Sequence, residues 1–68
     1  MSALETYLEH RPAILAAAFR ITGSRADAED VVQETWERWE QVDGESIASP
    51  RAYLSVMASR LALNALRT

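Results

Sequence analysis

Cysteine is absent from this chain of 68 residues, which also has only one histidine, two glycines and two prolines. Without cysteine there is neither a disulfide framework nor a thiolate zinc site, and a single histidine cannot build the usual nitrogen-ligand cluster. With only two glycines, the chain has no glycine-rich phosphate-binding loop. We therefore expect no metal, no other cofactor and no enzymatic activity.

Long apolar runs and a basic leader are missing as well. The longest apolar run, from Ala13 to Phe19, is much shorter than the roughly 20 residues that span a bilayer. The first residues carry Glu5 and Glu9 instead of the positive charges of a targeting segment. These features predict a cytoplasmic protein with no membrane partner.

The composition that remains is that of a small folded domain. Apolar residues make up 49% of the chain and charged residues 25%, which is typical of a globular protein and not of a disordered segment. A chain of this size buries only about 60% of the surface that its unfolded form exposes. We expect a single domain over residues 1–68, of marginal stability.

The charges are spread unevenly, although the net charge is only -3. Residues 1–23 carry no net charge, residues 24–46 carry eight acidic side chains against two arginines, and residues 47–68 carry three arginines and no acid. An acidic middle and a basic last third suggest two partners of opposite charge. The alternative is that the charged helix faces only keep a small protein in solution.

Apolar spacing predicts a first helix from Ser2 to Ile21, which Gly23 terminates. Its expected core side is formed by Leu4, Tyr7, Leu8, Ile14, Leu15, Ala18 and Phe19. Pro12 lies inside this stretch, lacks an amide hydrogen and clashes with the carbonyl four residues earlier. We therefore expect the helix to be kinked or broken at Pro12.

A second and more clearly amphipathic helix begins after Ser24, which is a good N-cap residue with Asp27 three residues later. Its apolar stripe consists of Ala28, Val31, Val32, Thr35, Trp36, Trp39 and Val42. Its opposite face carries Asp30, Gln33, Glu37 and Glu40. Glu34 precedes Arg38 by one helical turn, which predicts an ion pair between them.

The segment from Asp43 to Ser49 has the pattern of a loop, because Asp43-Gly44 is a turn signal and Ser49-Pro50 is an N-cap followed by proline. A third helix follows. Its expected core residues are Leu54, Met57, Ala58, Leu61 and Ala65, and its polar side holds Tyr53, Arg60, Asn64 and Arg67. No strand pattern occurs, so we predict the all-α class and a compact three-helix bundle.

Three motifs of the chain occur together in one known family. They are Arg11-Pro12-Ala13, the stretch GSRADAEDVVQETW from Gly23 to Trp36, and Pro50-Arg51-Ala52-Tyr53-Leu54. In this order and spacing they resemble region 2 of bacterial extracytoplasmic-function sigma factors, which belong to the sigma-70 family. The resemblance covers nearly the whole chain and implies a sigma-70 region 2-like bundle.

The resemblance implies a contact with RNA polymerase. In that family the acidic second helix docks on the clamp coiled coil of the largest catalytic subunit. By position, Asp30, Gln33 and Glu34 resemble the polymerase-contacting residues, and Glu37 and Glu40 extend the patch. Carboxylates and an amide on one helix face suit arginine side chains of a partner. Helix-dipole stabilisation is the alternative explanation for Asp30, but it does not extend to Glu37 or Glu40.

The resemblance also implies a contact with promoter DNA. The family's next loop and helix recognise the unpaired nontemplate strand of the minus-ten element and hold a flipped base between loop and helix. Arg60 and Asn64 resemble the residues that face DNA, while Arg51 and Arg67 are expected at phosphates. Tyr53 either stacks on a base or packs partly in the core.

A sigma factor of this kind has a second domain, which binds the minus-thirty-five element, and we expect that domain to be absent from this chain. Such an isolated domain should bind DNA weakly until polymerase supplies the other contacts. The main alternative is a helical module that binds polymerase or an anti-sigma factor without reading DNA. A helix-turn-helix regulator fits less well, because it needs a shorter turn and a more basic helix.

Overall fold

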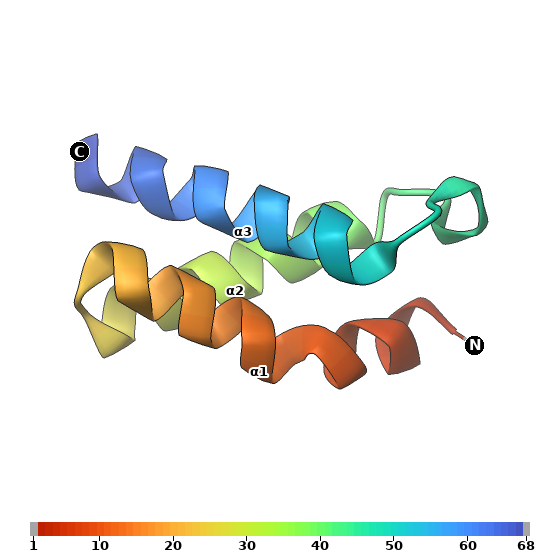
Figure 1. Cartoon of the computed structure of the whole chain (residues 1–68), viewed down its shortest axis with the longest axis horizontal. Coiled ribbons are helices and arrows are strands. Elements are labelled where there is room, and N and C mark those ends of the chain that lie inside the picture. Colours follow the sequence, from red (N-terminus) through yellow and green to blue (C-terminus); the bar gives the residue numbers. More distant parts are fainter. Residues whose placement is uncertain (1, 68) are drawn as a thin grey trace.

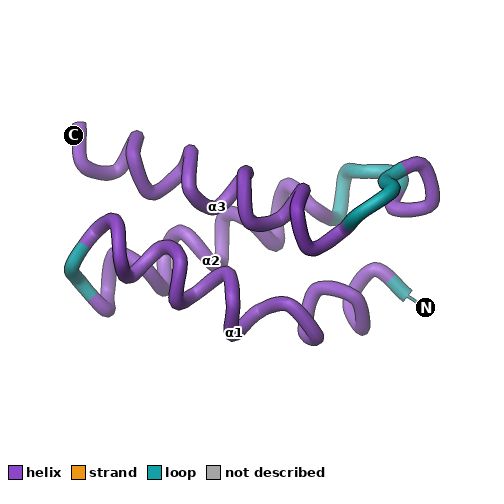
Figure 2. Tube along the Cα trace, viewed as in Figure 1, coloured by secondary structure: helices purple, strands orange, loops and turns teal. Residues whose placement is uncertain are grey.

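The computed structural model describes residues 2–67, which form three helices packed along one another (Figure 1). The helices are α1 (Ala3–Thr22), α2 (Arg25–Trp39) and α3 (Pro50–Arg67), and a short 3-10 helix, η1 (Gly44–Ser46), lies in the connection from α2 to α3. Figure 2 shows helices joined by loops and turns, with no strand between residues 2 and 67. The prediction of an all-α three-helix bundle is confirmed.

The start of α1 is closed by a complete capping box. The Ser2 hydroxyl accepts a hydrogen bond from the Glu5 amide at 3.1 Å, and the Glu5 carboxylate accepts one from the Ser2 amide at 3.2 Å. Two amide groups that a helix start leaves unpaired are thereby satisfied. The hydrogen bond from the Ser2 backbone lowers the pKa of the Glu5 carboxyl.

Pro12 lies inside α1 without breaking it. The helix is continuous from Ala3 to Thr22, and its ribbon bends in the N-terminal half (Figure 1). Of the two outcomes predicted for Pro12, a kink or a break, the helix therefore does not show the break. Both Pro12 and Leu8, whose carbonyl loses its usual amide partner, are exposed, so water is available to that carbonyl. The helix ends at Gly23, whose φ of 68° is left-handed and whose amide donates to the Phe19 carbonyl.

The hydrophobic core lies along the line where the three helices meet. It consists of Tyr7, Ile14, Ala18, Ala28, Val31, Val32, Trp39, Leu54, Ala58 and Ala62. The apolar stripe predicted for α2 is confirmed: Thr35 is also buried, and Trp36 lies half-buried at the edge. The hydroxyl of Thr35 donates to the Val31 carbonyl at 2.7 Å, so this buried polar group is satisfied.

Parts of the stripes predicted for the other two helices are wrong. Leu4, Leu8 and Phe19 are between 45% and 54% exposed, because the predicted stripe extends about 140° around α1, more than its two neighbours cover. On α3, Ala58 is buried as predicted, but Ala65 is exposed and Ala62 is buried instead. Ala65 lines an open groove beside the start of α2.

Two aromatic side chains fix how α2 is rotated about its own axis. The hydroxyl of Tyr7 donates to the Val32 carbonyl, and the Tyr7 ring packs on Trp36 with centroids 5.2 Å apart. The indole nitrogen of Trp39 donates to the Ala3 carbonyl at 3.0 Å. Because these contacts hold one side of α2 against α1, the opposite side must face outward.

Candidate functional site

The outward side of α2 carries the five side chains predicted to contact polymerase. They are Asp30, Gln33, Glu34, Glu37 and Glu40, all exposed, and we call them the acidic face. At about 100° per residue they fall within about 120° of the helix circumference. Glu37 and Glu40 lie at the C-terminal end of α2, where the helix dipole disfavours negative charge, so helix stability does not account for them.

Two ion pairs lie along α2 at the same i, i+4 spacing. One oxygen of Glu34 accepts from Nε of Arg38 at 3.3 Å and from Nη2 at 3.0 Å, which confirms the predicted pair. Arg25 donates to Glu29 at 3.2 Å. All four side chains are at least half exposed, so each pair contributes little to stability. Glu34 marks the border of the acidic face towards α3.

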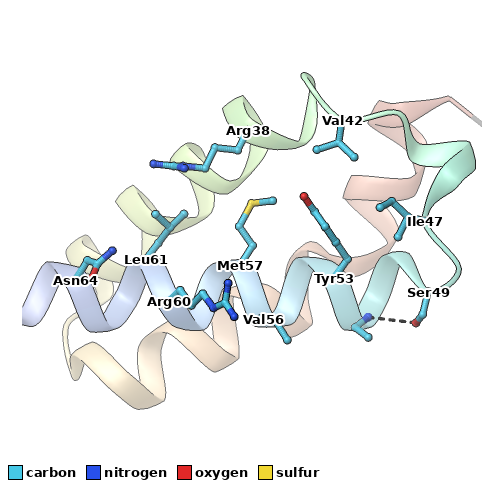
Figure 3. A pocket seen from close by; sticks show the side chains of 11 residues that line it. Arg38, Val42, Ile47, Ser49, Tyr53, Val56, Met57, Arg60, Leu61 and Asn64 are labelled. Carbon is cyan, nitrogen blue, oxygen red and sulfur yellow. Dashed lines mark hydrogen bonds between the residues drawn. The ribbon is translucent and has the colours of Figure 1, made fainter.

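A groove of about 790 Å³ lies between the end of α2, the connection after it and α3 (Figure 3). Its walls are Val42, Ile47, Ala52, Tyr53, Val56, Met57 and Leu61, and its polar residues are Arg38, Ser49, Arg60 and Asn64. No carboxylate from the described part of the chain lines it. The groove therefore combines apolar walls with two arginines and an amide.

Two local contacts shape the groove: the Tyr53 ring packs on Trp39, and Ser49 caps the start of α3. The Tyr53 ring packs against the Trp39 ring, with centroids 6.0 Å apart and planes tilted by 52°, and it stays 37% exposed. Both roles considered for Tyr53 are thus available to it, since the ring is partly packed and partly accessible. The Ser49 hydroxyl accepts from the Ala52 amide at 3.3 Å (Figure 3), and this cap, predicted from the sequence, sets the start of α3.

Of the residues predicted to contact DNA, three meet in the groove and two do not. Tyr53, Arg60 and Asn64 line it. Arg51 is exposed about 180° around α3 from Arg60, and Arg67 is exposed near the end of the helix, outside the groove. Arg67 lies on the same side of α3 as Tyr53, Arg60 and Asn64, one turn beyond the groove, so only Arg51 is on a different side of the helix.

Arg38 is the groove residue that the sequence pattern does not identify as a DNA contact. The pattern indicates it only as the ion-pair partner of Glu34. Helical spacing could have indicated this position, because it places Arg38 about 80° around α2 from Asp30, between the acidic face and the core stripe. Val42 and Ile47 were also missed as groove residues, since only the folded path of the connection brings them opposite α3.

Residues 2–67 show neither a metal site nor a membrane-spanning helix. No group of three or more histidine, cysteine or acidic side chains is placed to hold a metal ion in that range. None of the helices described is long and apolar enough to cross a membrane.

Comparison with known proteins decides the family. The family model of sigma-70 region 2 matches residues 6–68. The chain belongs to this family. The ECF RNA polymerase sigma factor SigJ of Mycobacterium tuberculosis (strain ATCC 25618 / H37Rv) is 46% identical over 68 residues, which are 100% of this chain and 20% of that protein. The chain thus spans about a fifth of that relative's length, and no solved structure matches it.

The resemblance to region 2 of an extracytoplasmic-function sigma factor is therefore confirmed. In this region 2 domain, a second groove of about 420 Å³ runs between the start of α2 and the end of α3. Asp30 and Glu34 of the acidic face line the second groove, and Arg38 and Asn64 line both grooves. The acidic face and the apolar groove thus adjoin each other along the Glu34–Arg38 pair.

Proposed function

We propose that this region 2 domain is a non-catalytic part of a transcription initiation factor. It docks on core RNA polymerase through the acidic face and binds the nontemplate strand of the promoter minus-ten element in the groove beside Tyr53. The observation that carries the proposal is the division of charge on one bundle: five exposed acidic or amide side chains on α2, against an acid-free groove with two arginines.

The acidic face supports docking on the clamp coiled coil of the largest polymerase subunit. Carboxylates accept bidentate hydrogen bonds from arginine, and opposite charges on two helices favour fast and specific association. The positions of Glu37 and Glu40 add to this argument, because carboxylates at the end of a helix carry a cost to the helix itself. A cationic partner surface offsets that cost.

The groove supports binding of an unpaired base. Apolar walls and the exposed part of the Tyr53 ring suit the flat face of a base, which stacks on aromatic side chains in single-strand-binding proteins. The Asn64 amide offers a donor and an acceptor to a base edge, and Arg60 offers a cation to a phosphate. Arg51 and Arg67, which lie outside the groove, contact phosphates farther along the strand.

The docking proposal is tested by titrating the domain with a peptide of the clamp coiled coil. Trp36 is half-buried beside Gln33 and serves as the fluorescent reporter. We expect micromolar binding, which the double variant Asp30→Ala/Gln33→Ala abolishes. Glu9→Ala, at an exposed acid of α1, is the control and should bind like the wild type. Equal binding by the double variant and the control would show that the acidic face is not the docking surface.

The DNA proposal is tested separately, with the domain placed in a full-length factor. Promoter-dependent transcription in vitro should fall strongly for the double variant Arg60→Ala/Asn64→Ala, while its affinity for core polymerase stays at the wild-type value. If transcription were unchanged, the domain would instead be a protein-binding helical module for polymerase or an anti-sigma factor, without DNA readout.

A further inference from the structure

Arg38 reaches over the groove from the side opposite α3. Figure 3 shows its side chain extending from α2 above Leu61, towards the end of the groove where Asn64 lies. The side chain is 58% exposed. Arg60 lines the same groove from α3, so the two walls of the groove each carry one arginine.

The ion pair with Glu34 leaves Arg38 with hydrogen-bonding capacity. One carboxylate oxygen accepts from Nε and Nη2, whereas a guanidinium has five N–H donors. An exposed pair of this kind is weak in water, so its geometry holds the guanidinium in place without removing it from other acceptors. A phosphate is an acceptor that arginine binds in a bidentate, charge-assisted way.

We propose that Arg38 binds a phosphate of the single-stranded nucleic acid that enters the groove, and that Glu34 weakens this contact by competing for the guanidinium. The inference rests on the proposed function of the groove and deepens it. A base held between the walls has a phosphate on either side along its strand, and Arg38 and Arg60 supply one cation on each wall. This contact should not depend on the nucleotide sequence, because the phosphate groups are the same at every nucleotide.

The same helix provides a matched control. Arg25 and Glu29 form an ion pair of the same spacing on α2, with similar exposure, and they line none of the grooves described above. Arg25→Ala therefore changes the net charge and removes an ion pair as Arg38→Ala does, but away from the groove. A difference in nucleic-acid affinity between the two variants is therefore due to the position of the arginine and not to the change in net charge.

The experiment measures fluorescence anisotropy of a fluorescein-labelled, mixed-sequence single-stranded oligonucleotide of about 12 nucleotides, titrated with the chain at several salt concentrations. Arg38→Ala should weaken binding about tenfold at low salt and reduce the slope of log K against log salt by about 0.7, the value for one phosphate contact on a single strand. Arg25→Ala should leave the slope at its wild-type value. Circular dichroism checks that each variant keeps its helix content.

Variants of Glu34 separate a phosphate contact from simple repulsion. Glu34→Gln should tighten binding, because a competing carboxylate is removed. The double variant Glu34→Gln/Arg38→Ala should bind more weakly than Glu34→Gln alone; equal affinity would mean that Arg38 acts only by masking Glu34, which overturns the inference.

Arg60→Ala distinguishes failure of this inference from failure of the proposed function. If Arg60→Ala weakens binding while Arg38→Ala behaves like Arg25→Ala, the role of Arg38 is wrong and the DNA groove stands. If the wild type does not bind the oligonucleotide even at low salt, or Arg60→Ala has no effect, the DNA groove and the role of Arg38 fail together.

Discussion

Tyr7→Phe tests the contact that orients α2 and hence the acidic face. The side chain of Tyr7 is 3% exposed, and its hydroxyl donates to the Val32 carbonyl. Phenylalanine keeps the ring that packs on Trp36 and removes only the hydroxyl. A buried neutral hydrogen bond contributes about 0.5–1.5 kcal/mol. The Val32 carbonyl lies within α2 and keeps its helical partner, so we expect a loss of about 1 kcal/mol, which lowers Tm by about 4–8 °C in a domain of this size.

The same variant should change how stability depends on pH. Burial raises the pKa of the Tyr7 hydroxyl above its ordinary value, and the Arg11 charge only partly opposes this. In alkaline solution the unfolded chain therefore releases this proton at a lower pH than the folded chain does. The stability that Tyr7 contributes is complete below the unfolded pKa and is lost as the pH rises through the folded pKa. Tyr7→Phe lacks this loss, so its free energy of unfolding should fall less steeply above about pH 10.

Urea unfolding followed by far-ultraviolet circular dichroism measures both effects. The midpoint urea concentration of Tyr7→Phe should be below that of the wild type at neutral pH, with an unchanged m value. The two midpoints should approach each other as the pH rises into the alkaline range. Equal midpoints at neutral pH, followed by parallel alkaline losses, would refute the role given to this hydroxyl.

Two further pairs of variants test the fold. Gly23→Ala should cost about 1 kcal/mol, because a left-handed φ of 68° penalises a side chain by about 1–2 kcal/mol, partly offset by a less flexible unfolded chain. Gly44→Ala should be neutral or slightly stabilising, since its new Cβ would lie 3.5 Å from Trp39 in ordinary contact; equal thermal midpoints for the two variants would contradict the cap. Leu54→Ala removes a fully buried side chain and should cost about 2–5 kcal/mol. Leu63→Ala, at a position that is 52% exposed on the same helix, should stay within about 0.5 kcal/mol, and similar losses in urea unfolding would contradict the core assignment.

The three-helix fold could be predicted because its local signals agree with its packing. In α2 the apolar and polar positions are cleanly separated around the helix, so the stripe from Ala28 to Trp39 is the observed core side. In α1 the apolar positions outnumber those that two neighbouring helices can cover, and periodicity alone does not say which of them stay exposed. Leu8 and Phe19 stay exposed for this reason. Pro12 changes the path of α1 without ending it, because packing on both sides of the proline holds the helix.

For the candidate site, too, the part formed by one helix could be predicted from the sequence, and the part formed by tertiary packing could not. The acidic face belongs to a single helix, so residue spacing alone places its five members together. The groove is assembled from three segments, and its walls depend on how the connection after α2 folds back on α3. In the sequence, Val42 is predicted at the end of the apolar stripe of the second helix and Ile47 is an apolar loop residue; α2 ends at Trp39, and both become groove residues only through the path of the connection. For Arg38 the sequence predicts only the ion pair with Glu34, whereas in the fold Arg38 both forms this pair and lines the groove.

The surfaces that stability does not explain are also the ones that the proposed function needs. Core positions of α2 are filled by side chains that fit against α1 and α3, and the caps at Ser2 and Ser49 satisfy helix ends. By contrast, Glu37 and Glu40 lie where the helix dipole opposes them, and the apolar side chains at the rim of the groove, such as Val56, remain accessible to water. A chain selected for stability alone would place cations at the end of α2 and polar side chains around the groove. These side chains, which are unfavourable for stability, therefore support the two faces of α2 and α3 that we propose as binding surfaces for partners of opposite charge.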